Sequence, residues 1–456
     1  MKISKSQWYY DVTHPSVLDI GFSIAIFILV AYAIQIISPF GFGWLLAICF
    51  PLATIVLTPV APVVGMGAFV FLSHGLPRYN AEFAQIQELM PLFPFATIAV
   101  FAGWIVRGRK DGPQIRWSNP GVVICTLFVG WLLICFWVGY FNNYQWTFSE
   151  FSRHHPINHL SGYVFFLMAV QLLGNKDATY FLAAIFICSI LLGGIANPKV
   201  ISLNSDLGAM VPIALPLAFL LFKSSSRSPA QILWSVTVVG LIILLLFTKN
   251  RAGLVGLIVA SILSIFVILP NKKIAASAVV TAGLLLVLVI PSDYVDRFSV
   301  LWNPNPTHAT ASLDQATIEG RLTLWECSSN FVRNEPIWGV GTGNFPKVIH
   351  QCNPDLYRLP AHNNFISFAV ESGLVGLMLY IALIISIYYA GLRRRREEDK
   401  WKTTAKGLLV ASFSAYLAVS FFVSRHDMVF AYMLMGWIVA LDIKLEINRN
   451  HEPNSH

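Results

Sequence analysis

Long apolar segments recur from end to end of this 456-residue chain, of which 56% of residues are hydrophobic and 12% are charged. Each segment is roughly 17 to 25 residues long, enough for an α-helix to cross about 30 Å of hydrocarbon. The segments lack the period-two alternation of a membrane barrel, so a lipid-exposed backbone can satisfy its hydrogen bonds only within helices. The sequence therefore predicts an all-α, polytopic membrane helix bundle.

The apolar segments predict about twelve to fourteen crossings. Their approximate bounds are 17–38, 43–58, 60–73, 93–107, 120–141, 158–173, 178–195, 207–223, 232–248, 253–269, 274–291, 364–391, 405–423 and 429–445. Pro51, Pro59 and Pro62 interrupt the pair 43–58 and 60–73, which we interpret as a re-entrant or kinked element.

Short basic connections at 107–116, 271–273 and 393–402 predict the orientation, because Lys and Arg mark the cytoplasmic side. The net charge of +8 is thereby explained by topology rather than by nucleic-acid binding. We expect both termini in the cytoplasm and no cleavable signal peptide. Segment 292–363 then lies on the outer face.

The chain divides into four predicted regions. These are N-terminal transmembrane helices with short loops (1–291), one long periplasmic loop (292–363), C-terminal transmembrane helices (364–447) and a disordered tail (448–456). Residues 76–92 have apolar positions at helical spacing, which predicts a helix lying in the outer interface or packed on the bundle.

His362 is the strongest candidate for chemistry in the long loop. It follows Pro360 and precedes the apolar run from Phe365, so it lies at a predicted helix start where Asn363 can cap free N–H groups. A neutral imidazole there can accept a proton from a hydroxyl. A purely capping or interfacial histidine is the alternative.

Arg251, Arg321 and Lys249 are predicted to lie on the same outer face. A guanidinium at the edge of hydrocarbon needs a partner unless it extends to the lipid headgroups, which is the alternative for Arg251. Because guanidinium groups bind phosphate oxygens in pairs, the three residues predict an anion site for a phosphorylated lipid.

Other polar clusters on the outer face give weaker signals. His154, His155 and His159 have a helical spacing, but Pro156 interrupts it and no carboxylate or cysteine completes a metal site. The glycines of 339–343 predict a turn rather than a phosphate loop, because no GK[ST] follows. Arg425 lies in another predicted outer turn and is a candidate supporting residue. We expect no metal and no cofactor.

Two of the six cysteines, Cys327 and Cys352, lie in the long polar segment. If that segment faces an oxidising periplasm, they can form a disulfide that stabilises the fold by roughly 3 kcal/mol. Two free thiols are the alternative.

The polar motifs of the second half resemble the O-antigen ligase and polymerase superfamily of bacterial envelopes. The turn TKNRAG at 248–253 is similar to that family's arginine turn. The other motifs are R-x-x-x-W (Arg321, Trp325), P-x-x-G-x-G-x-G (Pro336, Gly339, Gly341, Gly343), and H-N followed by E-x-G-x-x-G (His362, Asn363, Glu371, Gly373, Gly376).

The resemblance implies a fold like the GT-C-type membrane glycosyltransferases and a metal-independent, inverting transfer in the inner membrane, with the site on the periplasmic face. The donor would be an undecaprenyl diphosphate-linked glycan and the acceptor lipid A-core. Arg251 and Arg321 would hold the diphosphate, and His362 would activate the acceptor hydroxyl. Lys249, Trp325, Asn363 and Arg425 would contact substrate.

An O-antigen ligase is favoured because one dominant outer loop runs from R-x-x-x-W to H-N. A polymerase, which joins lipid-linked repeat units, shares the donor and the basic residues and remains an alternative. A bicarbonate-type transporter is a remote alternative, because transport predicts ionisable residues near the middle of spans and broken helices in paired halves. A purely structural membrane partner leaves the convergence of His362 with two arginines unexplained.

Overall fold

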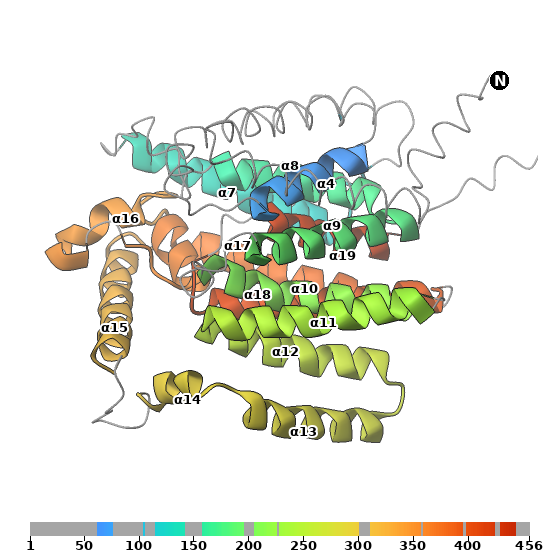
Figure 1. Ribbon diagram of the computed structural model, residues 1–456. Helices are drawn as coiled ribbons and strands as arrows, with labels where there is room; N and C mark the ends of the chain where they lie inside the picture. The colour runs from blue at the N-terminus through green and yellow to red at the C-terminus, as the bar shows by residue number, and fades with distance from the viewer. Residues whose placement is uncertain are drawn as a thin grey trace, which may run out of the picture.

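The computed structural model describes residues 62–75, 104, 115–141, 157–195, 205–225, 228–300, 311–356, 359–394, 398–424 and 429–443, and every regular element in these ranges is helical (Figure 1). In chain order the α-helices are α4 (Pro62–Gly75), α7 (Pro120–Phe141), α8 (Ile157–Leu172), α9 (Lys176–Ile195), α10 (Ser205–Ser224), α11 (Ser228–Thr248), α12 (Arg251–Ile268), α13 (Lys272–Val289), α14 (Ser292–Ser299), α15 (Ala311–Asn334), α16 (Phe345–Val348), α17 (Asn364–Leu392), α18 (Lys400–Ser420) and α19 (Val429–Asp442). Two 3₁₀ turns, η5 (Ile349–Gln351) and η6 (Pro354–Leu356), follow α16. The predicted all-α class is confirmed for this part of the chain.

Within the described ranges, 6 helices are long and apolar enough to cross a membrane. They are α7, α9, α10, α11, α12 and α17, and α8 and α19 are shorter apolar helices. The predicted spans 17–38 and 43–58, the predicted helix at 76–92 and the tail 448–456 lie outside the described residues. The molecule is therefore a helical membrane protein, whereas the full number of crossings stays a prediction.

Small residues allow the central helices to pack closely. A Cβ at Gly162 on α8 would meet the ring of Tyr432, and one at Gly436 on α19 would meet the carbonyl oxygen of Phe166. In a membrane, where lipid tails are as apolar as side chains, such close approach is a main source of helix association. Among the described helices, the pair α8 and α19 is the most extensively packed.

A buried ionic cluster joins the ends of α17, α18 and α19. Lys406, which is only 1% exposed, lies 3.1 Å from Glu398 Oε1 and 3.2 Å from Asp442 Oδ1. Its ammonium group also donates to the carbonyl oxygen of Arg393, 2.6 Å away. A buried charge is tolerated when it is paired and hydrogen-bonded in this way.

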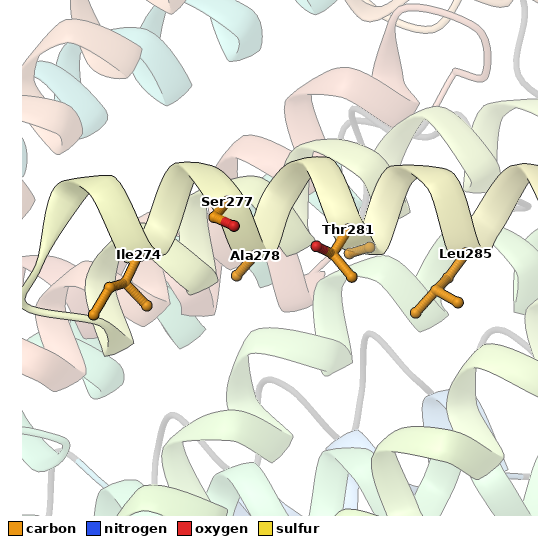
Figure 2. Close-up of a pocket in the computed structure, with 6 residues that line it drawn as sticks. Ile274, Ser277, Ala278, Thr281 and Leu285 are labelled. Atoms are coloured by element: carbon orange, nitrogen blue, oxygen red, sulfur yellow. The ribbon is translucent and has the colours of Figure 1, made fainter.

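Helix α13 lies at the edge of the bundle and packs mainly against α12 (Figure 1). Its apolar side chains are strongly exposed, Leu284 at 63% and Leu288 at 80%, as expected for a helix that faces lipid. Figure 2 shows a shallow hollow along this helix, lined by Ile274, Ser277, Ala278, Thr281, Ala282 and Leu285. Because one helix supplies the whole lining, the hollow is an open groove on the surface of α13.

Helix α17 is broken at Gly373, whose φ of 68° and ψ of −175° are not helical. The break releases backbone groups from the helical hydrogen-bond ladder inside an apolar span, where each would be costly if left unsatisfied. The chain just before α16 supplies partners: Val340 N donates to Val370 O at 2.8 Å, and Leu374 N donates to Pro336 O at 2.8 Å. Backbone groups of a segment distant in sequence thus form the hydrogen bonds that the break leaves unmade within α17.

The repairing segment, residues 336–344, is called the docking turn below. Its glycines at 339, 341 and 343 have φ values of 64°, 92° and 78°, which side chains other than glycine rarely adopt. A Cβ at Gly339 would meet the carbonyl oxygen of Val370, so the close approach to α17 also requires glycine. Thr342 Oγ1 donates to Leu132 O on α7 at 2.7 Å. The predicted turn is confirmed.

Replacing Gly373 with Ala should destabilise the protein by about 2 kcal/mol or more, since the left-handed conformation alone costs about 1–2 kcal/mol. The added Cβ would also meet the carbonyl oxygens of Ile337 and Pro336. The measurement is the thermal unfolding midpoint in detergent. Gly283→Ala is the control, because its Cβ would meet no atom within 4 Å. Equal midpoints for the two variants would contradict this assignment.

Candidate functional site

The segment between α13 and α17, predicted only as a long loop, is largely folded. Figure 1 shows α14, α15 and α16 gathered at one end of the bundle, with α15 lying across the membrane helices, while the connection from α12 to α13 lies at the other end. The 24 residues of α15 are polar enough to remain outside hydrocarbon and include many good helix formers. Hydropathy identified the segment as extramembrane and gave no signal for the helix.

Arg321 and Trp325 are separated by four residues on α15, so they share one face of that helix. Both side chains are half-buried. The indole Nε1 of Trp325 donates to the carbonyl oxygen of Ala361 at 2.9 Å, directly before His362. Trp325 therefore uses its polar atom to fix the backbone beside the candidate base, whereas its predicted contact with substrate stays a prediction.

The Cys327–Cys352 disulfide forms, as predicted, and joins α15 to the turn after η5. The two Cα atoms are 5.9 Å apart and the bridge closes a separation of 25 residues. Beside it lies a small apolar core of the extramembrane segment that includes Leu324, Phe345 and Val348. The arm that carries Arg321 and the arm that leads to His362 are thus held together by a covalent bond and by apolar packing.

His362 lies at the turn that begins α17, with a φ of 52°. The next residue, Asn363, is the N-cap: its Oδ1 accepts from Phe365 N at 2.8 Å and from Ile366 N at 3.2 Å. The predicted capping role of Asn363 is confirmed. Since Asn363 is buried and Ala361 on the other side is held by Trp325, the backbone on both sides of His362 is fixed and its half-buried imidazole remains at the surface.

Arg251 is the first residue of α12 rather than part of a longer turn. Asn250 caps this helix, because its Oδ1 accepts from Gly253 N at 2.9 Å. Lys249 is exposed and has a φ of 51°, which sharpens the turn between α11 and α12. The cap and the turn place the guanidinium at the end of the bundle that α15 covers.

Arg251 and Arg321 act on one another electrostatically although 70 residues separate them in the sequence. Burial and, second, the positive charge of Arg251 lower the pKa of the Arg321 guanidinium below its usual range. An arginine side chain still remains protonated at neutral pH, because its usual pKa lies far above 7. Two half-buried cations whose charges interact favour binding of an anion near them.

The remaining predicted residues separate into two groups. Arg425, His154 and His155 lie outside the described residues. His159 is fully buried in α8, with Nδ1 2.8 Å from the hydroxyl of Tyr432, which is the environment of a core histidine. Within the described part of the chain, no group of three or more His, Cys, Asp or Glu side chains could hold a metal ion.

Sequence reasoning missed the structural role of Glu371, which it treated only as a motif residue. Glu371 is 3% exposed inside α17, and its Oε2 accepts from Gly343 N in the docking turn at 2.9 Å. A carboxylate within an apolar span was the available signal. Sequence reasoning also missed Asn364, which donates to the Tyr416 hydroxyl at 3.0 Å and holds the start of α17 against α18.

Peptide mapping under non-reducing conditions should recover a linked peptide pair containing Cys327 and Cys352. Cys125 and Cys188, which are free in the structure, should be alkylated after denaturation without reductant. Replacing Cys327 and Cys352 with Ser should lower the free energy of unfolding by about 3 kcal/mol, because closing the loop restricts the unfolded chain. Alkylation of both bridge cysteines without reductant would contradict the bridge.

Replacing Trp325 with Phe keeps the ring packing but removes the donor to Ala361. We expect a cost of about 1–2 kcal/mol and faster amide hydrogen exchange in residues 361–366. Trp117→Phe is a matched control, because Trp117 is 57% exposed and lies before α7. Unchanged exchange in the Trp325 variant would show that the indole does not hold this backbone.

Residues 236–381 match the family model described as O-antigen ligase. The matched range begins in α11 and includes Arg251, Arg321, the docking turn, His362 and the break in α17. No curated protein sequence matches the chain significantly. The matched range therefore includes the candidate site residues that α12, α15 and the start of α17 carry.

Proposed function

Because the family assignment and the extramembrane site involve the same residues, we propose that this protein is a glycosyltransferase of lipopolysaccharide synthesis that acts as an O-antigen ligase. It transfers an undecaprenyl diphosphate-linked O-antigen glycan as one block to lipid A-core. The reaction takes place at the periplasmic face of the inner membrane, with both termini in the cytoplasm. Both substrates are lipids, which suits a protein whose site lies at the end of a membrane bundle.

The observation that carries this proposal is the electrostatic interaction between Arg251, at the start of α12, and Arg321, on the helix that covers that end of the bundle. These residues come from α12 and α15, and the charge of one lowers the pKa of the other. Two guanidinium groups held together offer several N–H donors to the oxygens of a diphosphate. They supply fixed positive charge where negative charge develops as the diphosphate departs.

His362 acts on the acceptor in this mechanism. Its neutral imidazole takes the proton from an acceptor hydroxyl, whose oxygen attacks the anomeric carbon of the donor sugar. The bond from that carbon to the diphosphate breaks, and the diphosphate leaves with the electron pair toward Arg251 and Arg321. A single displacement inverts the anomeric carbon and needs no carboxylate nucleophile. Lys249 adds positive charge near the same anion, and the contact of Arg425 with substrate stays a prediction.

A polymerase is the second candidate, because the family match supports ligases and polymerases alike. Both use the same donor and the same basic residues, and they differ in the acceptor. A transporter gains little support from the break in α17, since the docking turn fills that break. The helical break therefore offers no evidence of the solute pathway that transport would require.

The test of the proposed function is a reconstituted transfer assay with a lipid-linked oligosaccharide donor and a chelator. Lipid A-core and a second lipid-linked repeat unit are offered as acceptors in separate reactions. Glycan on lipid A-core supports a ligase. A lengthened lipid-linked chain as the only product would replace the ligase with a polymerase, and loss of all transfer on chelation would contradict a metal-independent reaction.

Substitution of the candidate residues should separate chemistry from folding. His362→Ala should lower the transfer rate by about 10²-fold or more, the usual effect of losing a general base. Arg321→Ala removes a guanidinium, and Arg251→Lys replaces one with a point charge that cannot donate in pairs. Each should therefore lower the transfer rate by about tenfold or more. Arg333→Ala is a matched control on the same helix, because Arg333 is exposed in the last turn of α15.

All four variants should insert and unfold like the wild-type protein. Wild-type turnover by His362→Ala or Arg321→Ala would refute the assigned roles, and an equal loss in Arg333→Ala would show that the assay responds to charge in general.

A further inference from the structure

Glu371 is a carboxylate within an otherwise apolar span, Asn364–Leu392, and is 3% exposed. Burying a carboxylate at such a position is costly unless it is hydrogen-bonded or paired, and an intramembrane ionisable residue is by default a functional candidate. Neither the attack of the acceptor nor the departure of the diphosphate uses this side chain. Its role must therefore come from its contacts.

The carboxylate contacts the docking turn at its last glycine. Glu371 Oε2 accepts from Gly343 N at 2.9 Å, and Gly343 has a φ of 78°. The preceding residue of α17, Val370, accepts from Val340 N at 2.8 Å. Successive residues of α17 thus hold both ends of the four-residue stretch from Val340 to Gly343.

The docking turn joins the two arms that carry the candidate chemistry. Before the turn, α15 carries Arg321 and ends at Asn334. After it, Phe345 begins the arm that runs through α16 and Cys352 to His362. A displacement of the turn would therefore move both arms relative to α12, which carries Arg251.

We propose that Glu371 is a positioning residue: its carboxylate anchors the docking turn to α17 and thereby holds Arg321 and His362 in register with Arg251. The inference rests on the proposed function, since the relative positions of Arg251, Arg321 and His362 matter only if these three side chains act on one donor. Misplacement of reacting groups by about 1 Å can cost about 10²-fold in rate.

The proposed role requires a hydrogen-bond acceptor and does not require a negative charge. Glutamine presents a carbonyl oxygen at the same distance from the backbone, so Glu371→Gln can still accept from Gly343 N. Alanine removes the acceptor and leaves the buried N–H of Gly343 without it. The pair of variants separates anchoring from a role in proton transfer.

Asp442 supplies a matched control. It is a buried carboxylate, 4% exposed, that pairs with Lys406 at 3.2 Å near the end of α17. The part of α17 from Glu371 to Leu392 spans roughly 30 Å at about 1.5 Å per residue, so this cluster lies far from the docking turn. Asp442→Ala should lower stability and leave the catalytic constants unchanged.

The experiment compares wild type, Glu371→Ala, Glu371→Gln and Asp442→Ala in the reconstituted assay, with amide hydrogen exchange of residues 336–344 measured on the same preparations. We expect Glu371→Ala to lower kcat per folded molecule by about tenfold or more, with a smaller change in KM, and to raise exchange in the turn. Glu371→Gln should restore both, and Asp442→Ala should change neither.

A wild-type kcat in Glu371→Ala, or a Glu371→Gln variant as defective as Glu371→Ala, would overturn the proposal. The exchange measurement tests the anchoring role independently of the proposed function, because amide hydrogen exchange requires no glycan transfer. If the wild-type protein transfers no glycan, the proposed function fails. In that case unchanged exchange in Glu371→Ala overturns the anchoring role as well, and faster exchange restored by glutamine supports the anchor.

Discussion

The repair of a broken membrane helix is the interaction on which the rest of the structure depends. At Gly373 the helix α17 leaves backbone groups that lipid cannot satisfy, and the docking turn supplies the partners at Val370 and Leu374. The dependence is mutual, because the docking turn also needs its hydrogen bonds to α17 to hold its left-handed glycines. An extramembrane segment is thereby fixed to the bundle through backbone hydrogen bonds rather than through side chains alone.

From this fixed point the extramembrane segment is held at further positions. The disulfide between Cys327 and Cys352 joins its two arms, and the indole of Trp325 holds Ala361 beside His362. Preorganisation of this kind is what electrostatic catalysis requires, because charged groups must already lie where charge will develop. In the proposed function the guanidinium groups of Arg251 and Arg321 meet that requirement at a cost in mutual repulsion, which an anionic ligand would relieve.

Hydropathy was sufficient for the membrane helices and insufficient for the site. The predicted span 120–141 coincides with α7, and 364–391 ends one residue before α17 does, because apolar runs and proline or asparagine caps are local signals. The cap at Asn363 was also predictable from the local sequence. The disulfide was predictable from the position of both cysteines in a segment expected to face an oxidising compartment. The break in α17 was not, since its stability depends on partners more than thirty residues upstream. The contact of Trp325 with Ala361 and that of Glu371 with Gly343 depend on the same tertiary arrangement.

The proposed function depends above all on the binding of one diphosphate by Arg251 and Arg321. The most direct test is the affinity of the purified protein for undecaprenyl diphosphate without a glycan, measured for wild type, Arg251→Gln, Arg321→Gln and the exposed control Arg333→Gln. Each of the first two substitutions should weaken binding by about tenfold or more, as expected for losing hydrogen bonds to a charged group, and the control should bind like wild type. Wild-type affinity in either Arg251→Gln or Arg321→Gln would contradict the proposed binding.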